Sequence, residues 1–289
     1  MSVQRNKNTV RCPVCFHHCL LAEGQYGTCR ARKNENGKIV CDSYGKVTAL
    51  MLDPIGKKPL KHFCPGSMVL SVGSFGCNLS CPFCQNYEIS MAGGGEAPGR
   101  EEILDYRRME PQEIADLAAS LRGRGNIGVA FTYNEPLVGY EFVRDTARLV
   151  SAAGMKNVLV TNGTAELSVL DELLPYIDAM NIDLKGFTEE YYRKLCGDLE
   201  TVKRFIVRAA DECHVELTTL IVPGENDREE EMEREARWIA SVDPDIVLHV
   251  TRFFPRYHMT DRDATDAETV YRLRDTAARY LRNVYTGNC

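Results

Sequence analysis

Residues 73–88 read GSFGCNLSCPFCQNYE and contain three cysteines, Cys77, Cys81 and Cys84, spaced as Cys-x3-Cys-x2-Cys. They directly follow the apolar stretch MVLSVGS (68–74), which is typical of a buried parallel strand. A closed structural metal site takes four protein ligands, whereas a site that does chemistry keeps one position open. A [4Fe–4S] cluster has four irons that cysteine thiolates normally bind, so three thiolates leave one iron for a ligand that is not protein. The stretch therefore predicts a cluster with one open iron on the loop after the first strand.

The alternative is a zinc site whose fourth ligand comes from elsewhere in the chain, for instance Cys64 or His62. With zinc, the protein would be a zinc-dependent hydrolase or a zinc-stapled binding module, and the three cysteines would hold no iron. That alternative does not explain the aromatic Phe83 directly before Cys84, or the position of the cysteines after a strand. We therefore favour the cluster.

From about residue 68 onward, short apolar runs alternate with amphipathic helical patterns, which is typical of βα units. The predicted strands are residues 68–74, 127–132, 157–162, 179–185, 214–223 and 245–254. The predicted helices cover residues 111–124, 136–154, 165–176, 188–212, 228–242 and 266–283. This alternation predicts an α/β fold, a partial (β/α)6 TIM-type barrel over residues 68–289. In such barrels the chemistry lies on loops at the carboxyl ends of the strands, so functional residues are expected there.

The segment 1–67 differs, because it has short turns, many cysteines and no long helical period. We predict that it is a small cysteine-rich appendage that binds metal. Its candidate ligands are Cys12, Cys15, Cys19 and Cys29. Their spacing resembles a closed zinc site, in which His17 or His18 could replace one thiolate, and it equally allows an auxiliary iron–sulfur cluster.

Composition excludes several classes of protein. The net charge of −6 argues against broad nucleic-acid binding, which needs a basic surface. No apolar run is long enough to span a membrane, and the N-terminal residues do not form a secretory signal, so we expect a cytoplasmic protein with no membrane association.

Thiols stay reduced in that compartment, so the twelve cysteines suggest metal chemistry rather than disulfides. The glycine-rich stretch 93–99 lacks a phosphate-loop pattern and is predicted to be a mobile loop.

The triad Cys77, Cys81 and Cys84, with Phe83 before the last cysteine, resembles the signature of the radical S-adenosylmethionine (SAM) superfamily. Together with FTYNEP (131–136), the surrounding sequence is similar to the pyruvate formate-lyase-activating-enzyme-like branch, and most of all to the radical SAM enzyme of the AmmeMemoRadiSam system. The resemblance implies that SAM binds the open iron, that reduction cleaves it to a 5′-deoxyadenosyl radical, and that this radical abstracts hydrogen from a small-molecule or peptide/protein substrate. An activase of a glycyl-radical enzyme is the alternative. Implied partners are a low-potential flavodoxin or ferredoxin and a Memo-like protein.

Small polar and charged side chains stand where the predicted strands end. The candidate SAM-binding residues are Phe83, Asn134, Glu135, Thr161, Asn162, Asp183, Lys185, His249 and Arg252. Glu135 can accept hydrogen bonds from the ammonium group of SAM. Asp183 and Lys185 alternate with apolar residues and so point to one face of their strand, where buried charges need partners. The resemblance implies that Lys185 meets the SAM carboxylate. For His249 the alternative is a core histidine in an apolar strand.

Overall fold

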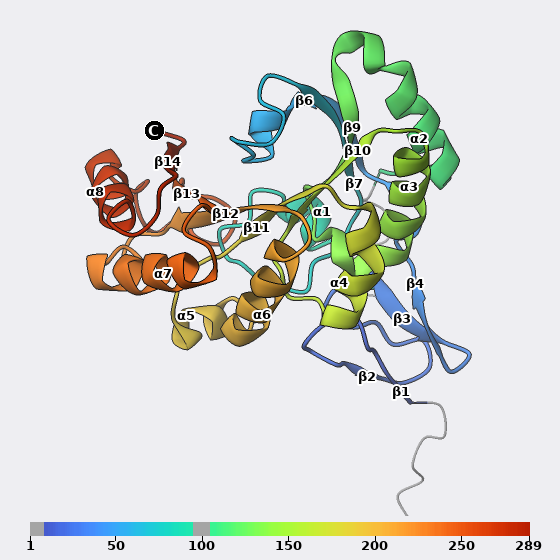
Figure 1. The fold of residues 1–289 in the computed structure, drawn as a ribbon. Helices are drawn as coiled ribbons and strands as arrows, with labels where there is room; N and C mark the ends of the chain where they lie inside the picture. The colour runs from blue at the N-terminus through green and yellow to red at the C-terminus, as the bar shows by residue number, and fades with distance from the viewer. Residues whose placement is uncertain (1–8, 95–104) are drawn as a thin grey trace, which may run out of the picture.

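The computed structural model describes residues 9–94 and 105–289, and its centre is an eight-stranded sheet. The strand order is β14-β13-β12-β11-β10-β9-β7-β6 (Figure 1). The strands are β6 (Ala49–Pro54), β7 (Met68–Gly73), β9 (Asn126–Phe131), β10 (Lys156–Thr161), β11 (Ala179–Asp183), β12 (His214–Ile221), β13 (Val247–Arg252) and β14 (Val284–Gly287). Neighbours from β7 to β14 are parallel, and β6 runs antiparallel to β7. The predicted α/β partial barrel is confirmed, and each predicted strand is present.

Helices cover the outer side of this sheet. They are α2 (Pro111–Ser120), α3 (Tyr140–Ala152), α4 (Leu167–Leu173), α5 (Glu189–Lys194), α6 (Leu199–Ala210), α7 (Glu229–Val242) and α8 (Ala267–Ala277), and the short α1 (Tyr87–Ser90) follows the triad. Single 3-10 turns lie at η1 (Ile55–Lys57), η2 (Arg122–Arg124), η3 (Pro136–Gly139) and η4 (Leu174–Tyr176). Figure 1 shows α2 to α4 beside one half of the sheet and α5 to α8 beside the other.

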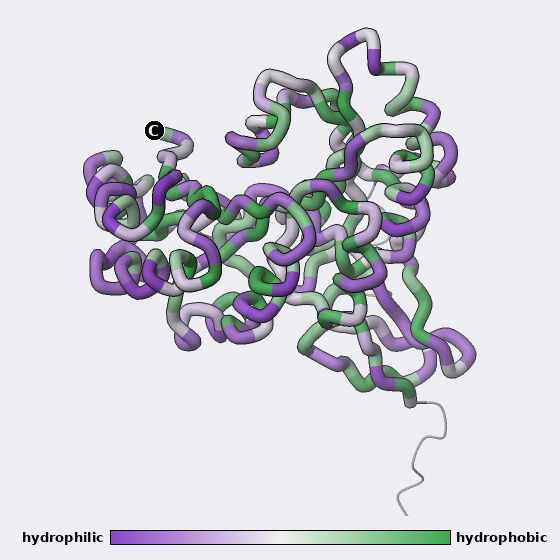
Figure 2. The backbone as a smooth tube through the Cα atoms, viewed as in Figure 1, coloured by the Kyte–Doolittle hydropathy of each residue, from purple (hydrophilic) through white to green (hydrophobic). Residues whose placement is uncertain are grey.

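The hydrophobic core lies between the sheet and these helices. Strand residues such as Leu159 and Leu217 and helix residues such as Leu170 and Phe205 have no exposed surface and belong to one contact cluster. Each such side chain contributes roughly 1.5–3 kcal/mol by leaving water. In Figure 2 hydrophobic residues gather along the central strands, and hydrophilic residues predominate on the outer helical turns.

The predicted helical stretch 188–212 is two helices rather than one. The chain turns at Cys196, whose φ of 56° lies in the left-handed region, and Gly197 follows. Asp198 then caps α6 by accepting a hydrogen bond from the N–H of Thr201 at 2.8 Å. The spacing of apolar residues alone did not predict this break.

The N-terminal region is built from short antiparallel strand pairs. They are β1 (Val10–Arg11) with β2 (Leu20–Leu21), β3 (Arg32–Glu35) with β4 (Lys38–Cys41), and β5 (Lys46–Val47) with β8 (Arg107–Arg108). Arg32, which is 4% exposed, fastens the region to α3 through the Glu141 carboxylate. The predicted boundary between residues 67 and 68 falls between β6 and β7, which are paired, so the two regions share one sheet.

No helix within residues 9–94 and 105–289 is long and apolar enough to cross a membrane. Most of the glycine-rich stretch 93–99 and the first eight residues of the N-terminal segment lie outside the described residues.

Candidate active site

The triad lies on the loop that leaves the carboxyl end of β7. Asn134, at the end of β9, fastens the start of this loop. Its Oδ1 accepts the N–H of Ser74 at 3.0 Å, and its Nδ2 donates to the carbonyls of Phe75 and Gly76 at 3.2 and 3.1 Å. Gly76 has a φ of 89°, and a Cβ there would come within 2.6 Å of the Cys29 carbonyl, so this position requires glycine. The loop is therefore held by the neighbouring strand and by the N-terminal region.

We expect Asn134→Ala to lower the free energy of unfolding by about 2 kcal/mol, because the buried backbone groups of this loop lose their partners. Denaturant titration of the metal-free protein measures the change. Asn283→Ala is the matched control, since Asn283 Nδ2 donates only an exposed hydrogen bond to the Asp245 carbonyl, and it should cost less than about 0.5 kcal/mol. Equal losses in both variants would contradict the role of Asn134.

A cavity of about 300 Å³ lies beside the triad, at the carboxyl ends of the parallel strands. Most of the predicted site residues line it: Cys77, Cys81, Phe83, Cys84, Asn134, Glu135, Thr161, Asn162, Asp183 and Lys185. Pro59 also lines it, and the carbonyl of Pro59 accepts a hydrogen bond from Nδ2 of Asn181, a residue inside β11. The N-terminal region thus contributes part of the cavity wall.

Glu135 is buried and ties two strand ends together. Its Oε1 accepts hydrogen bonds from the Thr161 hydroxyl at 2.7 Å and the Leu137 N–H at 3.0 Å, and its Oε2 accepts the Asn162 N–H at 2.7 Å. Burial raises the pKa of Glu135 to about 7, although these donors act in the opposite direction. A carboxylate has room for about four donors, so Glu135 retains capacity for one more.

Asn162 connects this cluster of polar groups to the triad. Its Nδ2 lies 3.7 Å from the Cys77 sulfur and donates to Asn78 Oδ1 at 3.0 Å. Asn78 Nδ2 in turn donates to the Thr164 hydroxyl at 2.7 Å. The first cysteine of the triad is therefore positioned by a buried amide network from the end of β10.

Asp183, the last residue of β11, and Lys185, which follows it, also line the cavity. Lys185 Nζ donates to Asp183 Oδ2 at 2.9 Å. Burial acts to lower the pKa of Lys185, but the Asp183 carboxylate and the Cys81 sulfur outweigh it and raise that pKa well above its ordinary value. The cavity therefore presents a permanent cation close to the second cysteine of the triad.

Cys81 is buried, whereas Cys77 and Cys84 are partly exposed. Burial raises the pKa of Cys77 well above its usual value, with a further increase from Glu135, and burial raises the pKa of Cys81 to about 11. Without metal these two groups are neutral thiols at pH 7, and metal binding has to release their protons.

Residues 71–236 match the sequence family described as the radical SAM superfamily. The chain belongs to the radical SAM superfamily. An uncharacterized protein of Methanocaldococcus jannaschii is 41% identical over 286 residues, which are 97% of this chain and 82% of the relative. Pyruvate formate-lyase 1-activating enzyme of Escherichia coli is 27% identical over 163 residues, which are 55% of this chain and 63% of that enzyme. The match therefore spans less than two thirds of the E. coli enzyme.

Solved structures agree on the fold of this radical SAM enzyme. SuiB of Streptococcus suis, solved with S-adenosylmethionine bound, has a TM-score of 0.57 at 14% identity, over 74% of this chain and 48% of SuiB. At that identity the similarity concerns the fold alone. The chain is thus a radical SAM enzyme with relatives like pyruvate formate-lyase-activating enzyme.

Two predicted site residues of this radical SAM enzyme do not line the cavity. His249 Nε2 lies 2.6 Å from Glu216 Oε2, deeper in the barrel. Glu216 also accepts the backbone N–H groups of Lys61 and His62 at 2.8 and 2.7 Å, so the pair holds the N-terminal region against the sheet. Arg252 Nε donates to the Thr265 carbonyl at 2.6 Å.

The four N-terminal cysteines of the radical SAM enzyme lie in one part of the molecule. Cys12, Cys15 and Cys29 are buried and Cys19 is partly exposed, with the Cys12 N–H donating to the Cys19 carbonyl at 2.9 Å. Burial raises the pKa of Cys15 to about 12, and the Asn78 side chain, which also accepts the hydrogen bond from Asn162, acts in the opposite direction. Within the described residues, no group of three His, Cys, Asp or Glu side chains converges closely enough to hold a single metal ion. Zinc or a second cluster at these cysteines stays a prediction.

The two histidines offered as substitute ligands have other contacts. His17 Nε2 lies 2.8 Å from the Asn78 carbonyl, and His18 Nε2 lies 3.1 Å from the Glu166 carboxylate.

Sequence reasoning missed a buried network on the cavity wall. Tyr133 has a φ of 77°, unusual for a residue with a side chain, and its hydroxyl donates to Asp53 at 2.7 Å. Lys58 Nζ and the Ser71 hydroxyl donate to the same carboxylate at 2.9 and 3.0 Å. Asp53 and Lys58 lie about eighty residues before Tyr133 and show no local pattern. Only the alternation of polar residues along the strands could have suggested such an interior network.

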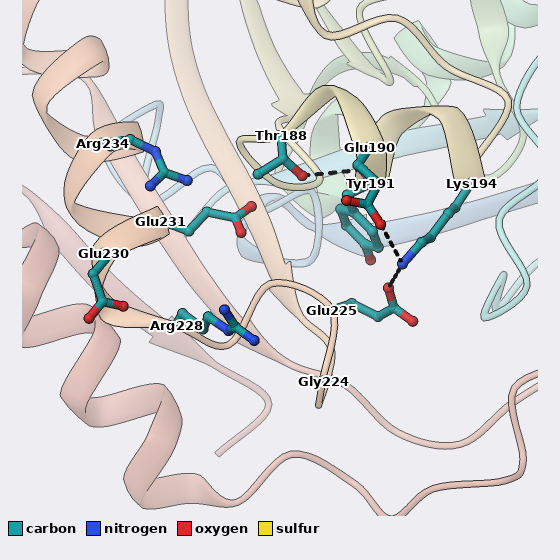
Figure 3. Close-up of a pocket in the computed structure, with 10 residues that line it drawn as sticks. All are labelled: Thr188, Glu190, Tyr191, Lys194, Gly224, Glu225, Arg228, Glu230, Glu231 and Arg234. Carbon is teal, nitrogen blue, oxygen red and sulfur yellow. Dashed lines mark hydrogen bonds and ion pairs between the residues drawn. The ribbon is translucent and has the colours of Figure 1, made fainter.

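A second cavity of about 500 Å³ lies outside the triad region, between α5 and the start of α7 (Figure 3). Its lining is mostly charged, and Lys194 pairs there with Glu225 at 2.9 Å and with Glu190 at 3.7 Å. No cysteine lines it within the described residues.

Proposed function

We propose that Cys77, Cys81 and Cys84 hold a [4Fe–4S] cluster with one open iron, and that the adjoining cavity binds SAM. The observation that supports this best is the arrangement of the cavity. Three cysteines of one loop line a space that Glu135 and Lys185 also line, and these two groups are suited to an amino group and a carboxylate. Thiolates are soft ligands of the kind that iron–sulfur clusters use, so the donor set fits.

When bound and reduced, the cluster supplies the electron that cleaves SAM, and the difficult chemistry belongs to these cofactors. The chain's own residues bind SAM and orient it. Glu135 accepts a hydrogen bond from the SAM amino group. The Thr161 hydroxyl and the Asn162 N–H hold the Glu135 carboxylate in place. Lys185 neutralises the SAM carboxylate, and Phe83, buried against Phe253 with ring centroids 6.3 Å apart, keeps water from the cysteine side.

The chemistry that the cofactors would supply here is removal of a hydrogen atom from a small-molecule or peptide/protein substrate. A glycyl-radical-activating role is the second candidate, because pyruvate formate-lyase 1-activating enzyme of E. coli and a putative glycyl-radical enzyme activating enzyme of M. jannaschii are relatives. The specific resemblance to the AmmeMemoRadiSam enzyme, a Memo-like partner and a flavodoxin or ferredoxin donor belong to the same proposal. The N-terminal cysteines would bind zinc or an auxiliary cluster.

Anaerobically reconstituted protein, reduced with dithionite and given SAM, should form 5′-deoxyadenosine, which chromatography quantifies. A chain that has assembled about four irons yet cleaves no SAM under these conditions would rule the proposal out.

SAM binding should weaken below pH 7. In the ligand-free protein Glu135 takes up a proton near pH 7, and the SAM ammonium favours the carboxylate, so binding at lower pH must displace that proton. Linkage predicts a Kd about fivefold higher at pH 6 than at pH 7. The raised pKa also means that this group's contribution to folding is present below about pH 4.5 and lost as pH rises through about 7.

Equilibrium dialysis of SAM at the two pH values, in wild type and Glu135→Gln, tests this dependence. The variant should bind more weakly at pH 7 and show no such change. The same pH dependence in both proteins would assign it to another group.

A further inference from the structure

Asn162, the residue that follows β10, is 5% exposed, and its side-chain amide is fully hydrogen-bonded within the protein. Its Oδ1 accepts the N–H of Thr164 at 3.1 Å and the hydroxyl of Thr164 at 2.6 Å. Its Nδ2 donates to Asn78 Oδ1 at 3.0 Å and to the Cys77 sulfur at 3.7 Å. A side-chain amide has two donor protons and two acceptor lone pairs, so these four bonds leave no group of this side chain for SAM.

The hydrogen-bond network determines which end of the Asn162 amide faces the sulfur. A backbone N–H can only donate, so the atom that meets the Thr164 N–H is the amide oxygen. The Thr164 hydroxyl gives its proton to the same oxygen and accepts from Asn78 Nδ2 at 2.7 Å, which leaves Asn78 Oδ1 to accept from Asn162. A flipped Asn162 amide would break all three contacts. The atom beside the Cys77 sulfur is therefore the donor, Nδ2.

The Cys77 sulfur also receives a hydrogen bond from its own loop, because the Leu79 N–H donates to it at 3.4 Å. Sulfur is a larger acceptor than oxygen, so both distances exceed the roughly 2.9 Å of an N–H···O bond. A cysteine binds metal as the thiolate, and hydrogen bonds to an ionised acceptor are stronger than those to a neutral one. Leu79 and Asn162 thus place two donors where a metal-bound Cys77 would carry negative charge.

We propose that the Asn162 side chain acts on the cluster rather than on SAM, by donating a hydrogen bond to the sulfur with which Cys77 binds the cluster and thereby raising its reduction potential. The inference rests on the proposed function, since it needs the cluster at the triad. Hydrogen bonds to the sulfurs are one determinant of the potential of an iron–sulfur cluster. The reduced cluster carries one more negative charge than the oxidised one, so the same donor stabilises it more. Asn162 makes the cluster easier to reduce.

The test compares the midpoint potential of the cluster in wild type, Asn162→Ala and Asn157→Ala by an EPR-monitored redox titration without SAM. Asn157→Ala is the matched control. Asn157 is a fully buried asparagine near the other end of β10, and its Nδ2 donates to the carbonyls of Ala147 and Tyr176 at 2.9 and 3.0 Å. At a fixed solution potential the ratio of reduced to oxidised cluster should fall about threefold in Asn162→Ala, a shift of ~28 mV at ~59 mV per tenfold for a one-electron couple. The control should titrate like wild type.

A second measurement detects the hydrogen bond in wild type, so it holds even if Asn162→Ala does not fold. Asparagine labelled with nitrogen-15 in the side chain is incorporated, and pulsed EPR of the reduced cluster should show a coupling to this nitrogen. The coupling should persist in Asn157→Ala and be absent from Asn162→Ala.

Three results would overturn the inference: a wild-type cluster without the asparagine coupling, an unchanged potential in Asn162→Ala, or an equal shift in both variants, which would assign the effect to the loss of any buried amide. A wild-type protein that assembles no iron would instead contradict the proposed function.

Discussion

The variant Cys77→Ala/Cys81→Ala/Cys84→Ala should lose about four irons per chain and all formation of 5′-deoxyadenosine. The three cysteines belong to one loop and line one cavity, and no other cysteine of the described residues lines that cavity and could replace them. Iron and zinc are counted by mass spectrometry on protein purified and reconstituted without oxygen. The same measurement reports on Cys12, Cys15, Cys19 and Cys29. Zinc that remains in the variant would be bound by these four cysteines. If wild type contains about eight irons and the variant keeps four, the four that remain would be bound by them.

The matched control for this variant removes three thiols that belong to neither cysteine group: Cys196→Ala/Cys213→Ala/Cys289→Ala. Cys213 Sγ donates only to the Ala209 carbonyl at 3.5 Å, and the other two are exposed. The control should keep the iron content and SAM cleavage of wild type. A triad variant with as much iron as the control would show that the cluster lies elsewhere.

The second large effect is expected at Lys185. In Lys185→Met the side chain keeps its length and loses its charge, so the SAM carboxylate loses its cation and Asp183 is left without the partner 2.9 Å away. We expect SAM to bind roughly 30- to 150-fold more weakly, which corresponds to about 2–3 kcal/mol for a charged hydrogen bond in a closed site. Isothermal titration of the reconstituted, unreduced protein measures this Kd directly.

Two further variants interpret the result for Lys185. Lys203→Met, which removes an exposed ion pair with Glu200 on α6, should leave the Kd unchanged. If Lys185 acted only by neutralising Asp183, the double variant Lys185→Met/Asp183→Asn would bind SAM as wild type does. We expect the double variant to stay weak. A Kd within twofold of wild type in Lys185→Met would exclude contact with the carboxylate.

The sequence predicted the central strands well because each is a short, continuous apolar run buried on both faces. β6 and β14 escaped prediction for a physical reason. They are the sheet's edges, and most of their residues are only partly buried, so neither forms a strand buried on both faces. The split between α5 and α6 was missed because it depends on the backbone conformation of Cys196 rather than on side-chain periodicity.

The residues of the site could be predicted from the sequence, but the hydrogen-bond partners of their side chains could not. Strand ends converge on one edge of a parallel sheet, so Glu135, Asn162 and Lys185 were expected to meet near the triad. His249 was expected at the cavity because it lies near the end of its strand, but it pairs with Glu216 and does not line the cavity. The use of Asn134 as a backbone clamp depends on loop geometry that no spacing reveals.

The most direct test of the central claim is the EPR spectrum of the anaerobically reduced wild-type protein, recorded before and after SAM is added. Three cysteine ligands and an open iron predict the signal of a reduced [4Fe–4S] cluster, whose g-values shift when SAM binds. The same reduced signal, unshifted at saturating SAM, would mean that SAM does not bind the cluster. Absence of any cluster signal in protein that contains zinc alone would contradict the assignment of the triad altogether.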